Sequence, residues 1–198
     1  MTATATTRPL GMLEWDSVAR GLEASDAMLK AAAVDAVVMR PITPGRYLTI
    51  VRGDVEAVRA SVAAGVLRGG DSVIEQLVLA SPHPGLFPAI GSRSKERQIR
   101  ALGVIETLTV CSLFAAADAA AKCGDVRLHD IRLAMGLGGK AFCVLTGEVS
   151  QVTVAVESGA AVAQSRGALL TTSIMANPDP ALVASLQEPS TPFRDLVF

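Results

Sequence analysis

An internal repeat constrains the fold of this chain more than any other feature. Shifting the sequence by 92 residues superposes residues 10–14 on residues 102–106. The offset then grows to 94 and to 96, and at 96 residues 80–84 fall on residues 176–180. A register that survives two short insertions indicates duplication of one module of about 90 residues.

The repeat also gives the module boundaries. Residues 91–100 lie between the two copies and are mostly small or charged, which is typical of a linker. We therefore expect the first module at residues 10–90 and the second at residues 101–188.

The hydropathy pattern of the first module predicts six elements. They are a strand at 10–14, a helix from Asp16 or Ser17 to about Ala32, strands at 36–42 and 47–52, a helix from Asp54 to about Gly65, and a strand at 73–79. We expect the first helix to turn four apolar residues inward, namely Val18, Leu22, Met28 and Leu29. The order predicts an α+β fold of two tandem β-α-β-β-α-β modules, each an antiparallel sheet with helices packed on one face.

Charge and composition exclude several classes of protein. There are 18 basic and 19 acidic residues, a net charge of −1, so the chain has no electrostatic reason to bind nucleic acid or an anionic membrane. Half of the residues are apolar, which excludes a disordered chain, but no apolar run reaches the ~20 residues of a membrane helix. The polar start and three cysteines favour a reducing cytoplasm.

The size of the module favours an oligomer. A module of about 90 residues buries only some 60–65% of its unfolded surface, and this one is rich in apolar residues. Two such modules side by side, repeated by rotation, would form a ring with nearly identical interfaces.

Several motifs occur in both copies. Each copy opens on L-G-x-[LI]-E, carries Asp-x-x-x-Lys in its first helix (Asp26/Lys30 and Asp118/Lys122) and ends on Pro-x-Pro. Together with the corner at residues 52–55, these motifs resemble bacterial microcompartment shell proteins, most closely the unpermuted tandem-domain class. The resemblance implies a hexagon-shaped homotrimer that tiles with hexameric and pentameric shell proteins around encapsulated enzymes, with loops around a central pore for small metabolites.

The resemblance also implies two sets of site residues. The pore turns would be lined by Ile42, Thr43, Pro44, Gly45, Met135, Gly136, Leu137, Gly138 and Gly139. Lys30 and Lys122 match the lysine at the tile edge, while His83 and Asp179 stand where family hexamers commonly carry an edge arginine. Four basic residues flank the turns and predict a pore that favours anionic or neutral metabolites: Arg40, Arg46, Arg132 and Lys140.

We expect no cofactor, no metal and no catalytic residues. Residues 136–140 are glycine-rich, but Ala141 stands where a phosphate loop needs a hydroxyl. Some tandem members hold an iron–sulfur cluster through a cysteine in the pore turn, and neither turn has one here. The three cysteines of the chain lack metal-ligand spacing and are expected in the core: Cys111, Cys123 and Cys143.

Two other functions compete with the shell tile. Tandem β-α-β-β-α-β modules also serve as small-molecule-binding regulatory proteins, and fold alone does not separate the two functions. An enzyme comes third, because His83 and His129 have no nucleophile or carboxylate pattern around them.

Overall fold

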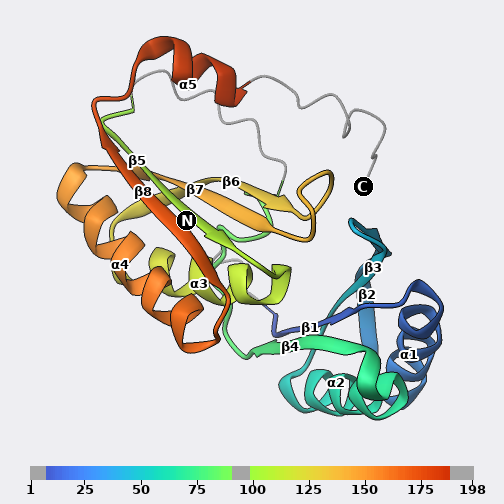
Figure 1. Ribbon diagram of the computed structural model, residues 1–198. Helices are drawn as coiled ribbons and strands as arrows, with labels where there is room; N and C mark the ends of the chain where they lie inside the picture. Colours follow the sequence, from blue (N-terminus) through green and yellow to red (C-terminus); the bar gives the residue numbers. More distant parts are fainter. Residues whose placement is uncertain (1–7, 91–98, 188–198) are drawn as a thin grey trace.

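The computed structural model describes residues 8–90 and 99–187 and confirms the two predicted β-α-β-β-α-β modules (Figure 1). The first module contains β1 (Leu10–Trp15), α1 (Val18–Ala31), β2 (Val34–Ile42), β3 (Arg46–Gly53), α2 (Val55–Gly69), a short 3₁₀ turn (Gly70–Ser72) and β4 (Val73–Leu79). The second contains β5 (Ala101–Thr107), α3 (Val110–Cys123), β6 (Val126–Leu133), β7 (Ala141–Gly147), α4 (Val149–Ser165) and β8 (Leu169–Ala176), followed by α5 (Pro180–Gln187). Most of the expected linker, residues 91–98, lies outside the described residues.

Each module has one four-stranded antiparallel sheet, and the two sheets have the same order. The first is β2-β3-β1-β4 and the second is β6-β7-β5-β8. A glycine in each central strand, Gly11 in β1 and Gly103 in β5, lies against the helices of its module. A Cβ at Gly11 would lie 2.6 Å from Val62, and one at Gly103 would lie 2.5 Å from Val156. The shared glycine of the L-G-x-[LI]-E motif is therefore required by close helix-to-sheet packing.

The inner face of α1 differs from the prediction. Gly21, Ala24, Ser25 and Met28 are buried, whereas Leu22 is 53% exposed and Leu29 is also exposed. The cause is the close approach of the helix to β3, because a Cβ at Gly21 would lie 2.5 Å from Tyr47. Small residues let the helix approach the sheet, and two of the four expected core positions are left on the outside.

The second helix is longer than predicted. We expected it to end near Gly65, but α2 continues to Gly69. Gly65 lies inside the helix because its missing side chain makes room for the first module's core: a Cβ there would lie 2.6 Å from Leu13 and 2.7 Å from Met28. Gly65 is therefore required by close packing and does not mark the end of the helix.

Two hydrophobic clusters organise the molecule. The smaller one lies between the first sheet and its own helices, around Leu13, Trp15 and Met28. The larger one contains the core of the second module and also Met12 and Leu77, which face the other side of the first sheet. Helix α3 contacts β1 and β4 there, so the second module covers the sheet face that α1 and α2 leave open (Figure 1).

Among the described residues, no helix is long and apolar enough to span a lipid bilayer.

Candidate pore rim and module junction

The structure brings the two predicted pore turns together. The backbone N–H of Thr43 donates to the Ala134 carbonyl oxygen at 3.1 Å, and the Thr43 hydroxyl contacts the same oxygen. The N–H of Gly136 donates to the Thr43 hydroxyl oxygen at 2.9 Å. Two turns that are about 90 residues apart in sequence thus form one rim.

The longer turn depends on its glycines in two ways. Gly136 and Gly138 are exposed and have positive φ angles of 71° and 62°. Gly139 has a φ of 88° and is buried, and a Cβ there would lie 3.0 Å from the Arg46 guanidinium and 3.2 Å from Pro44. Gly139 therefore allows the two turns to touch, whereas at Gly136 and Gly138 a Cβ would meet open space and only the positive φ favours glycine.

The other candidate rim residues differ in exposure. Pro44 and Gly45 are exposed, while Thr43, Met135 and Leu137 are half-buried. Ile42 is buried within the chain, in the larger hydrophobic cluster.

Most of the basic residues that flank the two turns are paired with carboxylates. Arg46 lies 3.8 Å from Glu14, Arg132 pairs with Asp130, and Lys140 lies 4.0 Å from Glu106. Glu14 and Glu106 come from neighbouring strands and are distant in sequence from Arg46 and Lys140, whereas Asp130 lies two residues before Arg132 on the same strand, β6. These ion pairs reduce the positive charge that the basic residues place beside the turns, and the preference for anionic or neutral metabolites stays a prediction.

The two candidate edge lysines have different surroundings. Lys122 donates to the Ser81 carbonyl oxygen and to Asp118, both at 2.5 Å, and Asp118 also accepts the His83 backbone N–H at 2.6 Å. Lys30 pairs with Asp26 at 2.6 Å, and its side chain is 74% exposed against 45% for Lys122. The second Asp–Lys pair thus connects the two modules, and Asp118 is buried, not on a solvated face.

The two residues at the expected edge-arginine positions have local roles. The His83 imidazole accepts the N–H of Gly85 at 3.1 Å. The Asp179 carboxylate accepts the N–H of Ala181 at 2.7 Å, at the start of α5.

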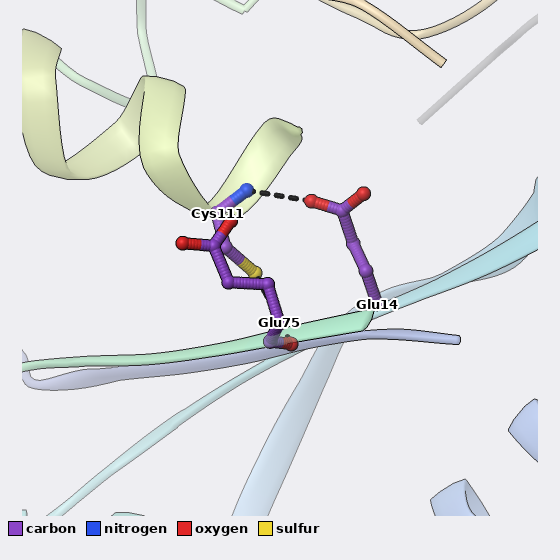
Figure 2. A group of neighbouring side chains, drawn as sticks. All are labelled: Glu14, Glu75 and Cys111. Atoms are coloured by element: carbon purple, nitrogen blue, oxygen red, sulfur yellow. Dashed lines mark hydrogen bonds between the residues drawn. The ribbon is translucent and has the colours of Figure 1, made fainter. Parts of the chain in front are cut away.

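A pair of glutamates holds the N-terminus of α3 on the first sheet, and sequence analysis did not single them out for this. Glu14 in β1 and Glu75 in β4 are opposite each other and point toward the start of α3 (Figure 2). The Cys111 N–H donates to Glu14 at 2.7 Å, and the Ser112 N–H donates to Glu75 at 3.1 Å. These are two of the N–H groups that a helix leaves without a partner in its own first turn.

Glu75 is the most highly connected of these groups. Its carboxylate also accepts from the Ser112 hydroxyl at 2.5 Å, from the Arg166 Nε at 2.7 Å and from the Thr109 hydroxyl. Arg166 reaches on to the carbonyl oxygen of Gln76 at 2.8 Å. Both oxygens of Glu75 are thus engaged, and a guanidinium balances its charge.

Glu14 is fully buried, and one of its oxygens has no hydrogen-bond partner among the described residues. Burial raises the pKa of this carboxyl from 4.5 to about 7, opposed by the N–H of Cys111. The only signal in the sequence is that Glu14 and Glu106 occupy the same place in the repeated L-G-x-[LI]-E motif.

Glu14, Glu75 and the thiol of Cys111 lie within 4.8 Å of one another, a spacing that a metal ion could span. The residues fit a helix anchor better. Glu75 has no free oxygen for a metal, and burial together with the two carboxylates raises the pKa of Cys111 well above its usual value, so the thiol stays protonated. Cys143 is also buried, but Cys123 is exposed, so the expected core position is wrong for Cys123.

Comparison with known proteins identifies the family. The BMC domain matches twice, at residues 9–82 and 101–178. The chain is 37% identical over 179 residues to the bacterial microcompartment shell protein PduT of Citrobacter freundii, covering 90% of this chain and 97% of that protein. The carboxysome shell protein CcmK2 of Thermosynechococcus vestitus is 45% identical over 82 residues, which cover 39% of this chain and 79% of CcmK2.

Solved structures give the same result. A crystal structure of a microcompartment protein from Desulfitobacterium hafniense superposes with a TM-score of 0.79 at 43% identity, over 89% of this chain and 98% of that one. The fused permuted hexameric shell protein MSM0275 of the RMM microcompartment shares the fold, with a TM-score of 0.59 at 20% identity over 79% and 81% of the two chains. Two BMC domains in tandem, in a chain that aligns with PduT over nearly its whole length, show that this protein belongs to the bacterial microcompartment shell proteins and is a structural shell tile.

Proposed function

We propose that three copies of this chain form a pseudo-hexameric tile whose central pore is lined alternately by residues 42–45 and 135–139. The contact between Thr43 and residues 134–136 carries the proposal, because it places equivalent turns of both modules side by side at one end of the junction. A ring that repeats this neighbour relation brings six turns around its axis. The turns differ in length, so the pore has threefold symmetry.

The tile acts with other shell proteins to enclose enzymes in the cytoplasm, and the pore passes small metabolites. The role is non-enzymatic, because the buried titratable residues at the junction serve to anchor α3. The module limits proposed from the sequence, residues 10–90 and 101–188 with a linker at 91–100, are retained.

Lys30 and Lys122 supply the contacts between tiles. Lys122 is held by Asp118 and Ser81 and still leaves 45% of its side chain exposed, so its ammonium group is oriented but accessible. An oriented lysine loses less side-chain entropy when it meets a neighbouring tile.

Light scattering after gel filtration and electron microscopy test the proposal together. We expect a trimer in solution and sheets, tubes or closed shells on overexpression. Replacing Lys30 by alanine should leave the trimer and remove the sheets, because the exposed Lys30–Asp26 pair contributes little to stability. A monomer or dimer at micromolar concentration would refute the ring. Dispersed oligomers whose melting temperature rises with a small ligand would favour the regulatory protein instead.

A further inference from the structure

One nitrogen atom of Arg46 lies beside three separate parts of the chain. Its Nη1 donates to the carbonyl oxygen of Leu108 at 3.2 Å and lies 3.8 Å from Oε2 of Glu14. The same nitrogen lies 3.0 Å from the point where a Cβ of Gly139 would stand. Arg46 begins β3 in the first module, whereas Leu108 and Gly139 belong to the second. A movement of this guanidinium therefore changes a contact with the longer pore turn.

The carboxyl group of Glu14 is the one of these three neighbours that can change its charge. Its Oε1 accepts the N–H of Cys111 at 2.7 Å, whereas Oε2 is buried and has no hydrogen-bond partner in the part of the chain that the structure describes. Hydrogen bonds between a guanidinium and a carboxylate are about 2.7–2.9 Å long. The gap of 3.8 Å to Arg46 thus leaves room for an approach of about 1 Å once Glu14 is ionised.

The charges around Glu14 come from the strands beside it and from the helices above it. Glu75 is opposite Glu14 in β4, Arg46 approaches from β3, and the thiol of Cys111 lies at the start of α3. Arg166, at the end of α4, is already paired with Glu75. Burial and the Glu75 carboxylate raise the pKa of Glu14 to about 7, although the N–H of Cys111 and the charge of Arg46 lower it. Glu14 therefore changes charge close to neutral pH, and Arg46 is the neighbour that can respond.

We propose that Arg46 couples the charge of Glu14 to the position of the longer pore turn. While Glu14 is neutral, the guanidinium stays against Gly139 and on the carbonyl oxygen of Leu108. When Glu14 ionises, the guanidinium moves onto Oε2, and residues 135–139 lose its support and shift. The inference rests on the proposed function only for the statement that this turn lines a pore, because the coupling itself lies within one chain.

The equivalent pair of the second module has a different environment. Lys140 lies 4.0 Å from Glu106, but 46% and 32% of their side chains are exposed, whereas the Glu14 side chain has no exposed surface. Water and salt screen the attraction between exposed charges. Ionisation of Glu106 therefore exerts little pull on Lys140, and Glu106 provides a matched control for Glu14.

Methyl NMR of the unmodified chain tests the coupling, because a methionine lies in the turn. Met135 is half-buried against the larger hydrophobic cluster, and Met28 is fully buried in the smaller one. In protein labelled with ¹³C at the methionine methyl groups, we expect the Met135 signal to shift with one midpoint near pH 7. The Met28 signal is the internal control and should not follow this transition. Met135→Leu assigns the signal.

Three variants identify the groups responsible. Glu14→Gln should abolish the shift of the Met135 signal, because it removes the charge. Arg46→Met should abolish the shift while Glu14 still ionises, as a continued fall in melting temperature toward alkaline pH would show. Glu106→Gln, the matched control, should keep both the shift and its midpoint. Circular dichroism checks that each variant is folded. If Arg46→Met does not fold, Arg46→Gln gives the same test, since it keeps a donor for Leu108 without the charge.

Several results would overturn the proposal. A Met135 signal that ignores pH, or that shifts as strongly in Glu14→Gln as in the wild type, excludes Glu14 as the titrating group. A shift that survives in the Arg46 variants excludes Arg46 as the connection, and a shift lost in Glu106→Gln assigns the effect to the second module. Light scattering separates this proposal from the ring. A monomer that shows the Met135 transition refutes the ring alone, and a trimer without the transition refutes the coupling alone.

Discussion

At the scale of the residue, the glutamate that ends the L-G-x-[LI]-E motif is buried in the first module and partly exposed in the second. Glu14 and Glu106 both follow an apolar pair at the end of the L-G-x-[LI]-E motif. Glu14 is covered by α3 and accepts a helix N–H, whereas Glu106 is still open. A carboxylate near a helix N-terminus is favoured by the unpaired N–H groups and the helix dipole. Burial at Glu14 opposes ionisation, and its elevated pKa shows that burial wins there.

This balance predicts how stability depends on pH. Glu14 has a pKa of about 7 in the folded protein against 4.5 ordinarily, so its contribution to stability is complete below about pH 4.5 and is lost as the pH rises through 7. The loss amounts to about 3 kcal/mol. Glu14→Gln keeps a neutral oxygen that accepts the Cys111 N–H. We expect this variant to remove most of the decline in melting temperature between pH 5 and pH 8 that the wild type shows. The same decline in both proteins would assign it to other groups.

The contact between the pore turns depends on one glycine. Gly139→Ala places a Cβ against Arg46 and Pro44 at a positive φ, while Gly136→Ala has a positive φ but open space. Both changes carry the backbone cost of about 1–2 kcal/mol, and only Gly139→Ala adds the clash. We expect a lower melting temperature for Gly139→Ala than for Gly136→Ala. Equal melting temperatures would mean that the two turns move apart without cost.

At the scale of the element, the sequence predicted the strands and helices of the two modules and their order, because each depends on local periodicity, but it did not predict α5 (Pro180–Gln187). It was less successful in predicting which face of a helix is buried and where a helix ends. Leu22 was assigned to the core because apolar residues at helical spacing usually face inward, but Gly21 and Ala24 make the close approach instead. Gly65 was taken as a helix end although it makes room for Met28. Both errors arise where a neighbouring element, invisible in a single sequence, decides which side chain fits.

In the candidate site, too, the local features were predicted from the sequence and the contacts between distant residues were not. The pore turns were predictable from glycine and proline, because turn chemistry is local. The anchor at Glu14 and Glu75 joins strands of one module to a helix of the other, so no sequence window contains it. The partners that neutralise Arg46 and Lys140 are also distant in sequence.

The anchor of α3 makes a prediction about coupling. Glu75→Gln and Arg166→Met each remove one partner of a partly buried pair, and the double variant removes both. We expect a coupling free energy of about 1–2 kcal/mol from denaturant unfolding of the four proteins. Gln76→Ala together with Arg166→Met is the control cycle, because Arg166 donates its hydrogen bond to the backbone carbonyl oxygen of Gln76, which the alanine keeps. Additive effects in the first cycle would show that Arg166 does not stabilise Glu75.

At the scale of the whole molecule, fusion of two modules makes one junction part of the chain and leaves the equivalent surfaces at its two ends exposed. The internal junction contains Glu75 and Arg166, while the exposed halves carry Glu106 and Leu22 without such a pair. A permanent junction tolerates buried charges that are always paired, whereas a junction that must form between separate copies is better made from neutral contacts. In the ring that we propose, this asymmetry follows from which junction lies within one chain.

The two turns of the proposed pore also differ, because the longer turn carries Gly138, which is exposed at a positive φ with open space around it. Three of the basic residues near the turns are neutralised by carboxylates, so a new charge at the rim would not be masked by them. Gly138→Asp adds three carboxylates to a trimer, and Gly138→Asn adds the same bulk without charge; both side chains tolerate a positive φ. In reconstituted shells, we expect Gly138→Asp to slow entry of an anionic substrate severalfold relative to a neutral one, because like charge at a narrow pore raises the barrier. Gly138→Asn should leave that ratio unchanged, and a ratio that shifts equally in both variants would show that bulk, not charge, controls entry.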